Sequence, residues 1–171
     1  MRSFFVCGDV NQRLTTWGLK SNDDLDWLGP NIQRKSITVS YRQSGRLVSL
    51  AGEVAAMGGA KASDTVLPDR VDVEGEAPVW TSGLADNSSI AAWLTERIEE
   101  IDWMVQKATT IAEAVFFVGL DHTISTHPDL FTKYLYVGAT RAATYLGITF
   151  DGEIPKIVQP LKKHFEDNWR M

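Results

Sequence analysis

The amino-acid sequence predicts a layered α/β fold in which helices cover a mostly parallel sheet. Strand-like and helix-like patterns alternate along the chain, which is typical of this class. The segment from Ala114 to Leu120 is a continuous apolar run, as in strands that are covered on both faces of a parallel sheet. With 171 residues, the chain has the length of one compact domain.

The first part of the chain is expected to contain two strands and a helix. Ser3 to Cys7 reads as a buried strand that ends at Gly8 and Asp9. Ser36 to Ser40 alternates like a second strand. From about Ser44 to Met57 apolar residues recur at helical spacing, and the following glycines supply a stop.

The middle of the chain predicts a surface connection, a short strand and a second helix. Residues 60–75 are polar and should lie on the surface. Pro78 to Trp80 is expected to form the strand, and Ser88 to Val105 an amphipathic helix that Ser88 or Ser89 caps. A solvated helix face is the expected location of the acidic run Glu96, Glu99, Glu100 and Asp102.

Two strands and a helix are expected in the last third. The apolar run from Ala114 to Leu120 forms the first strand, and Phe131 to Val137 leads into a helix and another apolar segment. Tyr145 to Phe150 is the last strand, which Asp151 and Gly152 end.

Composition narrows the classes of function. The formal net charge is −5, so a strongly basic surface that grips many nucleic-acid phosphates is not expected. The single cysteine, Cys7, cannot form an internal disulfide, and no leader peptide or membrane-spanning run of roughly 20 apolar residues is recognised. We therefore expect a cytoplasmic location and no membrane partner. The three histidines show no metal-ligand spacing, so no metal site is expected.

Two groups of polar residues that could bind a ligand each follow an expected strand. Gly8 to Gln12, with Trp17 beyond, occupies a position where α/β folds commonly bind ligands, although an ordinary turn stabilised by Asp9 would give the same pattern. Arg42 precedes a helix start, where anions are favoured, although a solvated arginine would look the same.

A third candidate group lies in the segment from Tyr134 to Ala142. Its near-apolar sequence places Thr140 and Arg141 next to each other. Rigid delivery of this kind is what an arginine finger needs, because its charge must meet the charge that develops on a transferred γ-phosphoryl group.

In this order, the three segments resemble motifs III, IV and VI of UvrD/Rep-type superfamily I DNA helicases. Gly-Asp-x-x-Gln-x-x-x-x-Trp at Gly8 to Trp17 is similar to motif III, and Ser40-Tyr41-Arg42 to the Asn-Tyr-Arg of motif IV, with serine in place of asparagine. Tyr136 to Ala142 resembles motif VI, Tyr-Val-Ala-x-Thr-Arg-Ala.

This resemblance implies a RecA-like, P-loop NTPase-type three-layer domain. Residues 1–30 would be the end of the first motor domain, and residues 31–171 the second. The resemblance gives catalytic or γ-phosphate-sensing roles to Arg141, Arg42 and Gln12, nucleotide contacts to Tyr41, Thr140, Gly8 and Asp9, and base stacking to Trp17.

The phosphate-binding loop (Walker A) and the acidic magnesium motif (Walker B) are not found in the sequence. The resemblance therefore implies that an amino-terminal RecA-like partner domain mainly holds ATP and Mg²⁺. It also implies that the protein moves along single-stranded DNA, and that this chain alone does not hydrolyse ATP. The resemblance also implies that a motif V segment has been lost, cut out or left out near residues 112–113.

Two other readings remain open at this point. One is a non-catalytic protein- or DNA-binding module derived from a truncated helicase, which the acidic balance and the missing motif V favour. The other is a free-standing α/β enzyme, for which the sequence offers no pair of nucleophile and base.

Overall fold

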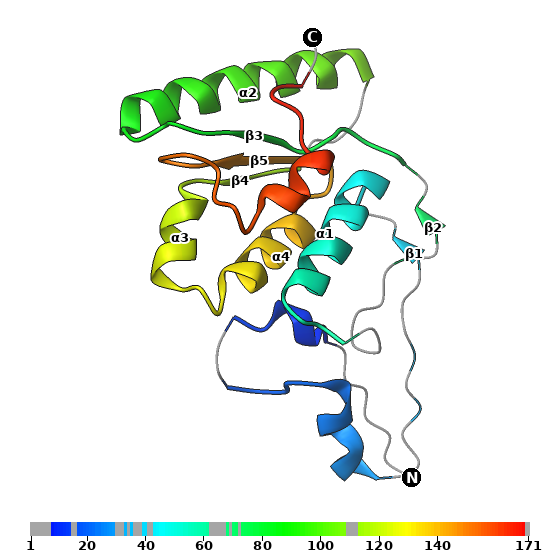
Figure 1. Cartoon of the computed structure of the whole chain (residues 1–171). Coiled ribbons are helices and arrows are strands. Elements are labelled where there is room, and N and C mark those ends of the chain that lie inside the picture. The colour runs from blue at the N-terminus through cyan, green and yellow to red at the C-terminus, as the bar shows by residue number, and fades with distance from the viewer. Residues whose placement is uncertain are drawn as a thin grey trace.

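The structure is a computed structural model of the whole chain (Figure 1). It describes residues 8–14, 17–29, 33, 35, 39–40, 43–61, 68, 70–71, 73–108 and 113–169. The strand expected from Ser3 to Cys7 and the expected gap near residues 112–113 lie outside these ranges, as does most of the strand expected from Ser36.

A three-stranded parallel sheet lies at the centre of the fold. Its strands are β3 (Val79–Thr81), β5 (Tyr145–Thr149) and β4 (Ala114–Phe117), in the order β3-β5-β4. Every residue of β5 is buried. A separate pair, β1 (Val39–Ser40) and β2 (Arg70–Val71), is also parallel. The all-parallel pairing agrees with the predicted α/β class.

Helices lie on both faces of the central sheet. Figure 1 shows α2 (Asn87–Ala108) along one face and α1 (Gly45–Met57), α3 (Leu120–Thr126) and α4 (Phe131–Arg141) beyond the other. Short 3-10 helices complete the described elements: η1 (Val10–Gln12), η2 (Asn22–Leu28) and η3 (Gln159–His164). The described part of the chain is therefore a helix, sheet and helix sandwich.

The alternation of side chains along β5 divides the core into two parts. Leu146, Ile148 and the following Phe150 belong to the larger cluster, which includes residues of α1, α4 and η3. Tyr145 points to the opposite face and packs in the smaller cluster with Trp93 of α2. Gly147 permits close packing there, because a Cβ atom at this position would lie 2.6 Å from the Phe116 ring.

Both helices that were expected from apolar periodicity are confirmed. The interval from Ser44 to Met57 corresponds to α1, which buries its apolar stripe and ends at Gly58 and Gly59. The second predicted helix corresponds to α2 but extends beyond both predicted ends. Asp86 caps α2 in place of the expected serines, because its carboxylate accepts hydrogen bonds from the backbone N–H groups of Ser88 and Ser89.

The prediction of a solvated acidic face on α2 is wrong for Glu100. This residue is only 5% exposed, and its Oε1 lies 2.8 Å from Nη2 of Arg97, which is 7% exposed. Its other oxygen accepts a hydrogen bond from the Trp169 backbone N–H. The carboxy-terminal segment covers this part of the helix, which local periodicity could not reveal.

The prediction for residues 114–120 also needs correction. Only Ala114 to Phe117 is strand, and none of these four residues is fully buried. Because β5 is the central strand, β4 lies at an edge of the described sheet. Gly119 then adopts a left-handed conformation (φ 65°), and α3 begins at Leu120. Within the described residues, no helix is both long and apolar enough to span a bilayer.

Candidate functional site

The loop that carries Gly8, Asp9 and Gln12 is ordered by the carboxylate of Asp9. This carboxylate accepts a hydrogen bond from the Asn11 backbone N–H at 2.9 Å and so caps η1. The side-chain nitrogen of Gln12 donates to the same carboxylate at 3.2 Å. These bonds place the Gln12 amide beside Asp9 at the start of the loop.

Tyr136 of α4 holds this loop against the rest of the fold. Its hydroxyl donates a hydrogen bond to Asp9 at 3.1 Å, and the residue is only 7% exposed. Burial and, to a lesser extent, the negative charge of Asp9 raise the pKa of the Tyr136 phenol. The phenol therefore stays protonated and able to donate at neutral pH.

Helix α4 contains nearly the whole segment that resembles motif VI. It buries Phe131, Leu135 and Ala139 on one side and presents Thr140 and Arg141 in its last turn. The Thr140 hydroxyl donates to the Val137 carbonyl at 3.1 Å, so its donor is used within the helix. Arg141 is exposed at the helix end.

Gln43 connects the segment that resembles motif IV to the end of α4. Its side-chain nitrogen donates to the carbonyl of Ala139 at 2.9 Å and to that of Ala142 at 3.4 Å. Both carbonyls belong to the carboxyl end of α4, where the helix itself supplies no N–H donor for them. The amide therefore fixes the helix end that carries Arg141. Tyr41 and Arg42, which precede Gln43, lie outside the described residues.

Residues of the segments that resemble motifs III and VI line one cavity of about 160 Å³, together with Gln43, which follows the segment that resembles motif IV. We call it the junction cavity. Asp9, Gln12 and Thr140, which the sequence singled out, are among its lining residues. Gly8, Trp17 and Arg141 do not line it. Its described lining residues are Asp9, Gln12, Gln43, Val48, Ala51, Pro68, Tyr136 and Thr140.

Neither the models of known protein families nor the curated proteins include a match to this chain. The resemblance to superfamily I helicases therefore depends on the three short sequence motifs alone.

Trp17 differs from the other predicted site residues because its side chain is 83% exposed. It lies in the connection between η1 and η2 and is not among the residues that line the junction cavity. A large exposed aromatic ring of this kind is suited to stacking against a base or to contact with another protein surface.

Sequence reasoning gave no role to Gln43 or to the hydroxyl of Tyr136. The available signal was weak in each case: a polar residue next to Arg42, and a tyrosine within an otherwise apolar helix face. Both contacts join residues about a hundred positions apart, so only the fold reveals them. Among the described residues, no three His, Cys, Asp or Glu side chains are grouped to hold a metal ion.

Proposed function

We propose that this chain is the carboxy-terminal motor part of an ATP-dependent DNA helicase of UvrD/Rep type, with a RecA-like second motor domain. The observation that carries the proposal is the junction cavity, where Gln12 and Thr140 from two motif segments lie together with Gln43, the residue after the third. A sandwich with a parallel sheet is compatible with a RecA-like domain, but such sheets support many activities, so the argument depends on the site.

In this proposal the partner domain holds ATP and Mg²⁺, and this chain closes over the γ-phosphate. Arg141 is the arginine finger: it stands on the last turn of a packed helix, whose end Gln43 holds through two carbonyls. Arg42 adds a second positive charge, and the Gln12 amide orients the phosphate or the attacking water. Catalysis of phosphoryl transfer depends mainly on such positioning and on charge stabilisation.

Coupling to DNA would run through the loop that contains Gln12. The same short segment leads from Asp9, which Tyr136 holds, to the exposed ring of Trp17. A change in Gln12 on γ-phosphate release would therefore be transmitted to a side chain suited to stacking on single-stranded DNA. Cycles of closure and release would move the motor along the strand.

The test is reconstitution with the amino-terminal motor domain, followed by measurement of ATPase activity stimulated by single-stranded DNA. Arg141→Ala should lower kcat by about 10³-fold or more if Arg141 is an arginine finger. Arg46→Ala is the matched control, because Arg46 is exposed and its ion pairs with the described residues Glu74 and Glu166 lie on the surface. Equal turnover in the two variants would remove the assignment.

The same reconstituted protein distinguishes the motor hypothesis from the alternative of a non-catalytic binding module. The net charge of −5 favours the module. A motor should bind single-stranded DNA with an affinity that falls as salt increases, and should hydrolyse ATP when reconstituted. A module would bind a protein partner with little salt dependence and without turnover.

A further inference from the structure

A second cavity, which we call the basic cavity, shares Tyr136 with the junction cavity. Its volume is about 220 Å³, whereas one water molecule needs roughly 10–15 Å³ of such space. It is lined by the carboxyl end of α1, the first turn of α4, and Val10, Asn11, Arg13 and Lys20. Tyr136 lines both cavities.

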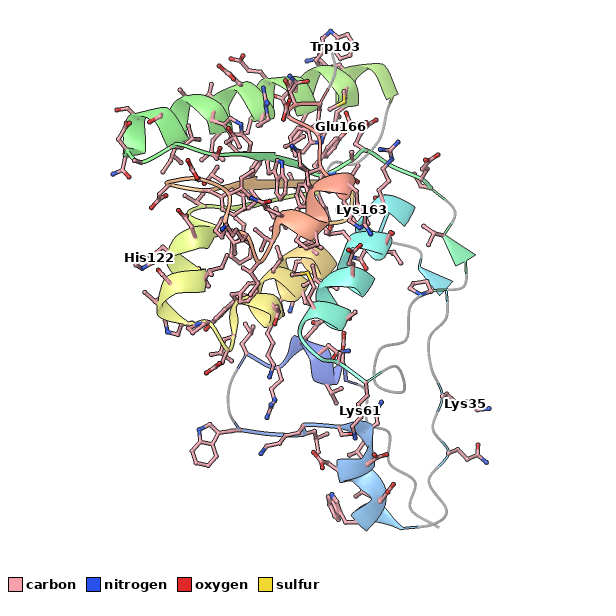
Figure 2. All side chains as sticks on the ribbon, in the orientation of Figure 1. Lys35, Lys61, Trp103, His122, Lys163 and Glu166 are labelled. Carbon is pink, nitrogen blue, oxygen red and sulfur yellow. The ribbon has the colours of Figure 1, made fainter. Side chains whose placement is uncertain are left out.

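The lining of this cavity is strongly basic in a chain that is acidic overall. Arg13, Lys20, Lys61 and Lys133 all line it, and no carboxylate does so among the described residues. The formal net charge of the whole chain is −5, so a cavity with this lining does not reflect the average surface. Figure 2 shows Lys61 next to the segment that carries η2.

Asp23 and Asp24, two described carboxylates that interact with these cations, lie outside the cavity lining. Lys61 Nζ lies 3.8 Å from Oδ2 of Asp23. Backbone hydrogen bonds from Lys20 and Ser21 and, to a lesser extent, the charges of Lys20 and Arg13 lower the pKa of Asp24. The carboxyl end of α1 adds the equivalent of about half a negative charge. Among the described residues, the four cations line the cavity and neither of these carboxylates does.

Lys133 is the most informative of these cations. It is half-buried, and its ammonium makes no ion pair or hydrogen bond with any residue that the structure describes. Burial and, to a lesser extent, the positive charge of Arg13 lower the pKa of Lys133. An anion bound between Lys133 and Arg13 would offset both of these unfavourable effects.

The donors that face the cavity are mainly side chains. The backbone N–H groups of Gly58, Gly59 and Ala60 already donate to carbonyls of α1. The Thr132 hydroxyl is next to Lys133 on the first turn of α4 and supplies an additional donor. Several ammonium groups, a guanidinium and a hydroxyl together suit a ligand with several anionic oxygens.

We propose that the basic cavity binds a phosphate group. The source is either a small phosphate compound or the backbone of a nucleic-acid strand, and both present the same anionic oxygens. Tyr136 is the only aromatic residue among the described lining residues, and its hydroxyl is bonded to Asp9, so the cavity is suited to phosphate and not to a base. The proposal stands independently of the helicase assignment.

The first experiment measures the affinity of the full chain for inorganic pyrophosphate by calorimetry at constant ionic strength. Lys133→Gln should weaken binding by about tenfold or more, because it removes a charge-assisted hydrogen bond. Lys156→Gln is the matched control, since Lys156 is exposed and does not line the cavity. Circular dichroism confirms that each variant is folded, and Lys20→Gln serves as a second test variant.

The second experiment identifies the source of the phosphate group. A fluorescent single-stranded oligo(dT) is bound to the chain and titrated with pyrophosphate. Displacement, weakened by Lys133→Gln, assigns the cavity to a strand phosphate, whereas pyrophosphate binding without displacement assigns it to a small compound. Identical pyrophosphate affinities of the wild type, Lys133→Gln and Lys20→Gln, or no binding at all, would overturn the proposal.

Discussion

The hydroxyl of Tyr136 donates a hydrogen bond to the carboxylate of Asp9, 127 positions earlier in the chain. Asp9 in turn caps η1 and accepts a hydrogen bond from Gln12. A single contact therefore joins the loop of the first motif segment to the helix of the third. Tyr136 also lines both cavities, and Asp9 lines the junction cavity.

Tyr136→Phe should lower the free energy of unfolding by about 0.5–1.5 kcal/mol. The loss should stay in this range because Asp9 is exposed and water can replace the phenol. Urea denaturation measures the change. Tyr134→Phe is the control, since the hydroxyl of Tyr134 makes no hydrogen bond with a described residue, and equal losses in both variants would contradict the assigned contact.

Alkaline pH should destabilise the protein through the same phenol. The pKa of Tyr136 is raised in the folded state, so above the ordinary tyrosine pKa of about 10 the unfolded chain loses its proton first. Stability should therefore be fully present below that pH and fall above it. The pKa of Tyr145 is also raised by burial, so Tyr136→Phe should reduce the slope without abolishing it. Thermal unfolding across this range provides the measurement, and identical slopes would contradict the prediction.

The parts of the fold that follow from local pattern were predictable from the sequence. Helices α1 and α2 have apolar residues at helical spacing, and the final strand is a short apolar run with a clear stop. The burial of Ala114 to Phe117 was not predictable, because strand order decides which strand is central and no local signal encodes that order. Glu100 was misjudged for a similar reason, since a distant segment covers it.

The candidate site was predictable only in part. The motif resemblance singled out Asp9, Gln12 and Thr140, and these residues line one cavity. It could not indicate that Gln43 would hold the end of α4, because that contact depends on how two helices pack. The basic cavity has no sequence motif at all: Arg13, Lys20, Lys61 and Lys133 come from separate segments.

Gln43→Glu should destabilise the protein by about 1–3 kcal/mol at neutral pH. The change removes the donor and places a carboxylate against the carbonyl oxygens of Ala139 and Ala142. The introduced carboxyl should have a raised folded-state pKa, so the deficit should shrink as pH falls through about 4–5 and a donor returns. Gln159→Glu is the control, because Gln159 makes a longer, exposed bond to Ile154, and a deficit of the same size there would argue against the role of Gln43.

Arg97→Met should cost about 3–5 kcal/mol, because it leaves the buried carboxylate of Glu100 without its partner. Burial already raises the pKa of Glu100 despite the opposing effect of Arg97, so acidification towards pH 5 should recover part of the loss. Replacing both residues, Arg97→Met with Glu100→Leu, should be less damaging than Arg97→Met alone. Urea denaturation of both variants tests this, and a double variant less stable than the single one would count against it.

Gly138→Ala should destabilise the protein although alanine is the better helix former. Gly138 stands where the motif VI pattern has alanine, and a Cβ atom there would lie 2.7 Å from Cε2 of Phe117. Overpacking of this kind costs about 1–3 kcal/mol, whereas the helix propensity of alanine contributes only about 0.5–1 kcal/mol. The net loss should be measurable by urea denaturation.

Phe117→Leu should relieve this clash, so Gly138→Ala should cost less in a Phe117→Leu background than in the wild type. Gly45→Ala is the matched control, because a Cβ atom at that helical position meets no atom closer than 3.8 Å and should leave stability unchanged or raised. A stabilising Gly138→Ala would mean that the Phe117 ring moves away without cost, and that this end of β4 is not packed as firmly against α4 as its contact implies.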